Sequence, residues 1–131
     1  MANKRDEVLA AAEWKVMRIV WQKKSCAARD VYVETAAKHG WAPSTTKTLL
    51  ARLVEKGYLH AKRVGNSFLY RPAEPAIKTL AGAADELLSH ALEGTVAPLL
   101  AHMVKKSKLT GEELAELRQL LDKHRSKEGT K

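Results

Sequence analysis

A predicted helix over residues 43–56 gathers short hydroxyl and long cationic side chains on one face. Pro43 suits the first helical position, where its missing N–H is not needed, and Gly57 suits the position just past the end. Hydroxyls, lysine and arginine side chains and a helix N-terminus can bind phosphates or the edges of bases. An ordinary solvated helix face is the alternative, because amphipathic helices are common. The residues of this outward face are Ser44, Thr45, Lys47, Thr48, Ala51, Arg52 and Glu55.

A second predicted helix, from Ala27 to His39, must position this face. Gly40 ends that helix, and only a short turn at residues 39–42 separates it from the helix that follows, so we expect a helix-turn-helix. The inward side of the later helix should pack against the earlier one. That side is a stripe with helical spacing, made by Thr46, Leu49, Leu50, Leu53 and Val54.

A helix at the start of the chain should supply the rest of the core. It is predicted from about Lys4 or Ala10 to Lys23, with Asn3 as a candidate N-cap, and Ser25-Cys26 breaks the chain after it. We interpret its apolar face as core, because helical spacing usually indicates packing; the alternative is that the two tryptophans form a platform on which bases stack. This face consists of Trp14, Val16, Met17, Ile19, Val20 and Trp21.

Beyond Gly57 the periodicity changes, and two short apolar runs predict a β-hairpin. The runs flank Gly65-Asn66, an order that favours a type II′ turn with glycine first, and Pro72 ends the second run. Three helices followed by a basic hairpin are the layout of a winged helix. We expect nearby polar side chains to hold phosphates and set the register on DNA, although Arg29 could instead pair with Asp30 or Glu34. The expected phosphate contacts are Arg29, Lys56, Lys62, Arg63 and Asn66.

The net charge of +8 is concentrated in the first half of the chain. Residues 1–75 carry 14 Lys and Arg against 7 Asp and Glu, whereas residues 76–131 carry 9 against 8. This asymmetry favours a polyanionic partner for the first half. The one cysteine excludes an internal disulfide framework, and no apolar run approaches the ~18 residues of a membrane span. The charged N-terminus does not resemble a signal peptide, so we expect a soluble cytoplasmic protein without membrane insertion.

The second half predicts three more helices, over residues 76–92, 95–106 and about 110–124. Thr110 and Glu113 form a capping-box pattern at the start of the last one. Three short helices bury little by themselves, so their leucines need another surface; a second copy is the economical choice, and folding back on the first domain is the alternative. The expected dimerisation residues are Leu87, Leu88, Leu92, Val96, Leu99, Leu100, Val104, Leu114, Leu117 and Leu121.

The sequence lacks the arrangements that enzymes use. It has no phosphate-cradling glycine loop, and no pair of carboxylates stands in a cleft-forming context. Cys26 and the five histidines lack zinc-ligand spacing; the alternative is a metal site where His90, His102 and His124 approach one another across a dimer. We therefore expect no enzyme, no cofactor and no metal.

Four segments together resemble the penicillinase repressor (BlaI/MecI) family. They are Ala-Glu-Trp-Lys-Val-Met-Arg-Ile-Val-Trp (12–21), Ala-Arg-Asp-Val-Tyr (28–32), Gly-Trp-Ala-Pro-Ser-Thr (40–45) and Lys-Thr-Leu-Leu-Ala-Arg-Leu-Val-Glu-Lys-Gly-Tyr-Leu (47–59). The similarity extends through the hairpin into residues 99–104 and 112–117. The resemblance implies a mostly α, winged helix-turn-helix fold with a small β-hairpin wing and a C-terminal three-helix dimerisation region. It implies a homodimeric repressor of a near-palindromic operator, in a family that silences genes such as β-lactamase or copper-transport operons.

The chain departs from the family pattern at several places. Ala10 and Ala27 stand where the family often has capping Ser or Thr, a loss of about 1 kcal/mol each, and Thr46 replaces a usual Val or Ile. No cysteine follows Cys26, which excludes the copper-responsive cysteine motif. Antibiotic-responsive relatives are cut by a membrane-bound metalloprotease. The matching place here is near His102-Met103, without the Asn-Phe pair of well-known members.

The sequence thus predicts a DNA-binding domain over 1–74, a dimerisation region over 75–124 and a disordered tail over 125–131. The leading hypothesis is a sequence-specific repressor of a double-stranded DNA operator, with two recognition helices ~34 Å apart and a sensor protease as a candidate partner. A winged-helix module for protein assembly and a non-specific DNA-binding protein are the alternatives.

Overall fold

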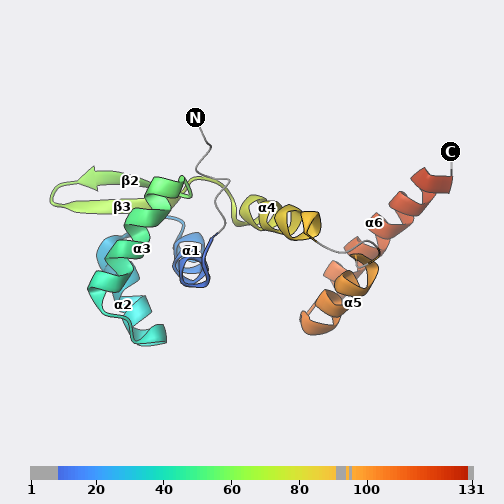
Figure 1. Ribbon diagram of the computed structural model, residues 1–131, viewed down its shortest axis with the longest axis horizontal. Coiled ribbons are helices and arrows are strands. Elements are labelled where there is room, and N and C mark those ends of the chain that lie inside the picture. Colours follow the sequence, from blue (N-terminus) through green and yellow to red (C-terminus); the bar gives the residue numbers. More distant parts are fainter. Residues whose placement is uncertain (1–8, 91–93, 95, 130–131) are drawn as a thin grey trace. The chain divides into compact units, whose positions relative to one another are not determined.

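The computed structural model describes residues 9–90, 94 and 96–129, with side chains up to Ser126. Its chain divides into two compact units, residues 1–86 and 87–131, and this division falls inside the fourth helix. Figure 1 shows a helical fold with one small sheet. The elements are α1 (Ala11–Lys23), β1 (Cys26–Ala27), α2 (Ala28–His39), α3 (Pro43–Lys56), β2 (Leu59–Val64), β3 (Ser67–Pro72), α4 (Ala76–Ser89), α5 (Val96–Lys106) and α6 (Gly111–Gly129).

Helices α1 and α2 begin after alanines that have no capping side chain. In each helix an acid at the third position accepts a hydrogen bond from the backbone N–H of the cap residue instead. The distances are 2.7 Å from Ala10 N to Glu13 Oε1 and 3.1 Å from Ala27 N to Asp30 Oδ2. This is half of a capping box, and it partly offsets the missing serine or threonine. The candidate cap Asn3 lies outside the described residues.

Helices α2 and α3 form the predicted helix-turn-helix. Gly40 is left-handed at φ +67°, and it closes α2 with hydrogen bonds from Gly40 N to Ala36 O (3.0 Å) and from Trp41 N to Thr35 O (3.4 Å). The first of these two bonds is that of the αL C-cap motif, which glycine accommodates without strain. Between the helices, the buried Thr46 and Thr35 hydroxyls lie 2.6 Å apart. Because Thr35 donates to Tyr32 O at 3.2 Å, Thr46 is the donor of this pair.

A three-stranded antiparallel sheet in the order β1-β3-β2 completes the first unit. The hairpin is as predicted: Val64 pairs with Ser67 around Gly65, which has φ +62°, while Asn66 keeps a negative φ, as a type II′ turn requires. Strand β1 was not predicted, since the sequence there reads as a break. Cys26 and Ala27 pair with Tyr70 and Leu69, and this short strand ties the start of α2 to the wing.

The core lies between α1, α2, α3 and the base of the sheet. Trp14 and Trp21 are only half-buried and pack against its edge, whereas Val16 and Ile19 are fully inside. The buried hydrophobic residues are Leu9, Val16, Met17, Ile19, Val20, Cys26, Val31, Leu49, Leu50, Leu53, Tyr58 and Leu59. The predicted stripe of α3 is therefore confirmed, with Val54 half-buried at its margin.

Helices α5 and α6 of the second unit bury none of their described side chains. The predicted capping box is present in α6, with Glu113 N to Thr110 Oγ1 at 3.1 Å and Thr110 N to Glu113 Oε1 at 3.0 Å. Helix α6 continues to Gly129, although the sequence analysis expects disorder from residue 125. Lysine, arginine and glutamate have high helix propensity, so a capped helix can extend through this charged segment. Residues 91–93 and 95, including Leu92, lie outside the described residues.

Candidate nucleic-acid interface

The outward face of α3 is exposed along its length, as the sequence predicts. All seven of its residues are exposed, and no acid stands in the first turn. Thr48 Oγ1 donates to Ser44 O at 3.0 Å, so its hydroxyl hydrogen is used within the helix. Thr48 can therefore offer its methyl group and a lone pair to a base edge, but no hydrogen.

The N-terminus of α3 adds a backbone donor that the sequence analysis did not name. Pro43 has no N–H, while Thr45 N and Thr46 N both donate to Ala42 O, at 3.0 and 3.4 Å. Among the described residues, nothing accepts the N–H of Ser44. This amide stands beside the exposed Ser44 hydroxyl at the positive end of the helix, where anions are favoured.

Arg29 is exposed at the start of α2, and both acids predicted as its alternative partners are engaged elsewhere. Asp30 accepts from the Ala27 backbone, and Glu34 pairs with Lys38 (3.2 Å) and Lys23 (3.7 Å). Arg29 is therefore available to an anion from outside the molecule.

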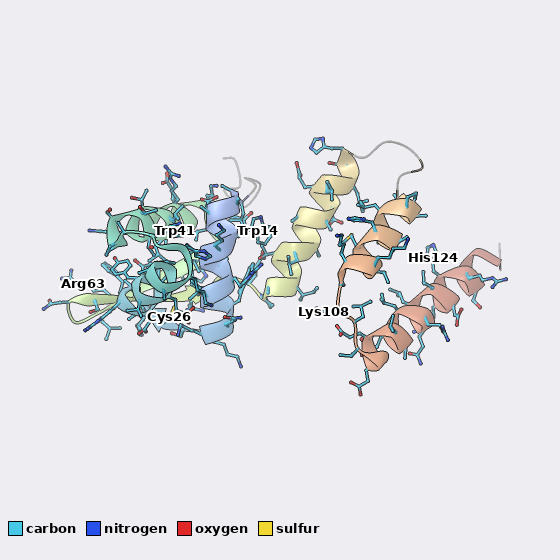
Figure 2. The ribbon with its side chains drawn as sticks, turned by 90° about the horizontal axis from the view of Figure 1, so that it is seen from below. Trp14, Cys26, Trp41, Arg63, Lys108 and His124 are labelled. Carbon is cyan, nitrogen blue, oxygen red and sulfur yellow. The ribbon has the colours of Figure 1, made fainter. Side chains whose placement is uncertain are left out.

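The wing carries its cations on both faces of the hairpin. Figure 2 shows Arg63 near the far end of the hairpin, where its Nε donates to Gly65 O at 3.2 Å. Strand alternation places Arg63 and its partner Phe68 on one face, and Lys62 and Leu69 on the other. Asn66 is exposed in the turn. Lys62, Arg63 and Asn66 therefore all lie toward the turn of the hairpin, but Lys62 and Arg63 lie on opposite faces of it.

Arg71 is an exposed wing cation that the sequence analysis did not single out. It pairs with His60 on the face that carries Lys62. Once Gly65-Asn66 is fixed as the turn, the two-residue period of the strands assigns Arg71 to this face. The hairpin therefore presents more positive charge than Lys62 and Arg63 alone.

Lys56 differs from the other predicted phosphate contacts. Its Nζ lies 2.7 Å from Glu13 Oε1, which ties the end of α3 to the start of α1. The Glu13 side chain is 1% exposed and that of Lys56 is 19% exposed. A lysine that neutralises a buried carboxylate cannot leave it without a large penalty. In the structure the Lys56 ammonium is therefore held at the Glu13 carboxylate.

The turn between α2 and α3 is fixed by aromatic packing. The Trp41 ring lies 5.0 Å from the His39 ring, and Lys15 Nζ lies 5.9 Å from the Trp41 centroid. Such contacts each contribute up to about 1 kcal/mol at partly exposed sites. The Lys15 contact links the turn before α3 to α1.

Cys26 has the character of a packing residue. Burial raises the pKa of the Cys26 thiol, and the nearby Asp30 carboxylate raises it further. In the part of the chain that the structure describes, no three His, Cys, Asp or Glu side chains gather as a metal-ligand set. No helix among those residues is long and apolar enough to cross a membrane. The chemistry of this unit therefore lies in its exposed cations and hydroxyls.

A helix-turn-helix followed by a two-stranded wing, with cations along the second helix and the hairpin, defines a winged helix-turn-helix of the DNA-binding class. The family model described as penicillinase repressor matches residues 9–123. The methicillin resistance regulatory protein MecI of Staphylococcus aureus is 31% identical over 123 residues, which cover 94% of this chain and 99% of that protein. The penicillinase repressor of Bacillus licheniformis is 29% identical over 119 residues, covering 91% and 93%.

Among solved structures, the DNA-binding domain of the repressor BlaI matches with a TM-score of 0.50 and 32% identity, over 52% of this chain and 83% of that chain. The chain belongs to the penicillinase repressor family, a family of winged-helix transcriptional repressors that are not enzymes.

Proposed function

We propose that this protein is a homodimeric repressor that recognises a near-palindromic DNA operator with α3 in the major groove. The observation that carries this proposal is the exposed face of α3, which combines hydroxyls, cations and a free N-terminal amide with no acid in its first turn. An α-helix fits the major groove, where each base pair presents a distinct pattern of donors and acceptors.

The interface residues divide into two groups by their position. The first group reads bases from α3, with Lys47 reaching guanine and threonine methyls touching thymine methyls: Ser44, Thr45, Lys47, Thr48 and Arg52. The second group holds phosphates around that helix and fixes its register: Arg29, Lys62, Arg63, Asn66 and the newly assigned Arg71. Lys56 is left out because of its ion pair with Glu13.

Dimerisation through the second unit is supported by its exposed apolar side chains. Leucines, valines and a methionine form an apolar stripe along one side of each of α5 and α6, and most of them are exposed to solvent. A second copy would cover them, as in most symmetric oligomers. We assign the interface to Leu87, Leu88, Val96, Leu99, Leu100, Met103, Val104, Leu114, Leu117, Leu120 and Leu121.

Proteolytic release would act on this second unit. His102 and Met103 are exposed on α5, a helix that buries no described side chain, so its local opening should cost little before a partner covers it. A sensor protease in the cytoplasmic membrane is the partner class that family resemblance implies. Cleavage between His102 and Met103 would remove the end of α5 and all of α6, and with them six of the eleven proposed interface residues.

Footprinting on the DNA upstream of the protein's own gene tests the proposal. We expect protection of two half-sites about one helical turn apart. If ~6 phosphates are neutralised, log K should fall with log salt at a slope near −5. Lys47→Ala should weaken protection, and the matched lysine variant Lys123→Ala in α6 should not. Equal affinity for random DNA, or a slope near zero, would contradict the proposal.

A further inference from the structure

A hollow on the first unit has no part in the proposed DNA interface. It has a volume of about 420 Å³ and is lined by Trp14, Arg18, Trp21 and Leu80. Three of these residues follow the i, i+4, i+7 spacing of one helix face on α1, and Leu80 comes from α4. Figure 2 shows Trp14 on the side of α1 that faces α4. The volume lies within the usual range for small-molecule sites.

The walls of the hollow are largely aromatic and partly exposed. The Trp14 and Trp21 rings lie 6.0 Å apart between centroids and are tilted by 52°. Both side chains are only half-buried, and Leu80 is 49% exposed. Large apolar side chains left in water on one concave surface indicate a place where another apolar group binds.

Two polar groups of the residues that line the hollow have no partner among the described residues. Arg18 is exposed and forms no ion pair with any residue that the structure describes. The indole N–H of Trp21 is buried, and no described group accepts its hydrogen. The indole nitrogen is shielded from solvent, so the exposed Arg18 guanidinium is the polar group that a ligand in the hollow can reach. A guanidinium matches a carboxylate in charge and in geometry.

We propose that this hollow binds a small aromatic carboxylate, with the carboxylate on Arg18 and the ring against Trp14, Trp21 and Leu80. The ligand would contact both α1 and α4, and α4 is the element that leads from the winged helix into the second unit. Its binding would therefore bias the position of α4 and act as an effector of the repressor. The binding step itself does not depend on operator recognition.

The three tryptophans allow a direct test on the full-length protein. 2-Naphthoate serves as the probe, and the ¹⁵N–¹H signals of the three indoles report where it binds. We expect the Trp14 and Trp21 signals to shift and saturate at about 1 mM probe or below, while the signal of Trp41 stays in place. Trp41 lies in the turn before α3 and is not part of the hollow.

Two comparisons test the carboxylate contact. Arg18→Ala should weaken naphthoate binding by about tenfold or more, whereas the matched variant Arg118→Ala on α6 should not change it. Neutral 2-naphthamide, added to the unmodified protein, should bind about tenfold more weakly than naphthoate, so the test stands even if the Arg18 variant folds poorly.

Three outcomes would overturn the proposal. The first is an absence of saturation, or equal shifts of all three indole signals. The second is equal binding of naphthoate and naphthamide. The third is a response of the Trp14 and Trp21 signals to protein concentration rather than to naphthoate, which would assign the hollow to a second copy of the chain. A failure of operator binding would leave all of these readouts unaffected.

Discussion

Replacing Lys56 by methionine should destabilise the first unit while leaving the charge contacts to DNA in place. The methionine keeps most of the lysine's hydrocarbon but removes the cation 2.7 Å from Glu13 Oε1. The carboxylate would remain 1% exposed without its partner, and the bond that Glu13 accepts from Ala10 N would not neutralise it. The expected consequence is a weaker junction between α1 and α3.

The magnitude follows from burial. Breaking a buried pair by removing one partner costs about 3–5 kcal/mol, and we expect the low end, about 3 kcal/mol, because Lys56 is partly solvated. With a urea dependence of ~1.5 kcal/mol per M for the free energy of unfolding, the unfolding midpoint should fall by about 2 M. Adding Glu13→Gln should recover most of this loss, because the neutral amide needs no cation and its oxygen can still accept from Ala10 N.

Tryptophan fluorescence in urea measures this effect, since Trp14, Trp21 and Trp41 all lie in the first unit. Lys62→Met is the matched control, for which we expect the opposite result. It should leave the urea midpoint unchanged and make the salt slope of operator binding shallower by about 1. For Lys56→Met we expect a lower urea midpoint and an unchanged salt slope. The salt slope is measured without urea, under conditions in which the variant is folded. An unchanged midpoint together with a shallower slope would show that Lys56 contacts phosphate and that the reasoning from its burial is wrong.

Four further predictions concern the threonine pair, the recognition face, the second unit and the cysteine. Thr35→Val should cost about 1–3 kcal/mol in thermal unfolding because it strands the buried Thr46 donor, and adding Thr46→Val should restore most of it; equal losses would contradict the pairing. Lys47→Ala should lose about 1–3 kcal/mol of discrimination at one base pair per half-site in operator-variant titrations, whereas uniform weakening across sequences would make it a phosphate contact. Leu99→Asp should give monomers in light scattering, while Val33→Asp, an added charge on the exposed face of α2, should not; an unchanged mass for Leu99→Asp would contradict the interface. Cys26 should react with Ellman's reagent at least about tenfold more slowly in the folded protein than in urea, and faster as pH rises, since burial raises the pKa of its thiol; a rapid reaction when folded would show that β1 opens.

Much of the first unit was predictable because its signals are local. Pro43 and Gly57 mark both ends of α3, and Gly65 identifies the turn of the wing, since each residue has a backbone preference that depends on its own position. The apolar stripe of α3 followed from its spacing. These features need no knowledge of what packs against them.

Several features that the sequence did not reveal depend on partners that are distant along the chain. Strand β1 has two residues, and it is a strand only because both residues pair with β3. Glu13 is a second example. This charged residue of α1 is buried because it pairs with Lys56, which lies 43 positions later in the sequence. Thr46, which stands where the family usually has Val or Ile, is buried with its hydroxyl paired because Thr35 supplies the acceptor. Composition and periodicity carry no information about such pairings.

The two buried polar contacts of α3 have a common consequence for recognition. Thr46 is held by Thr35 near the start of the helix, and Lys56 is held by Glu13 at its end, with the apolar stripe between them. Apolar packing alone tolerates small rotations and slides, whereas hydrogen bonds with short distances restrict them. Base readout depends on side chains placed to within about 0.5 Å. We infer that these contacts fix the rotation of α3 about its axis, so that the residues which would read bases emerge at a defined angle even before DNA is bound.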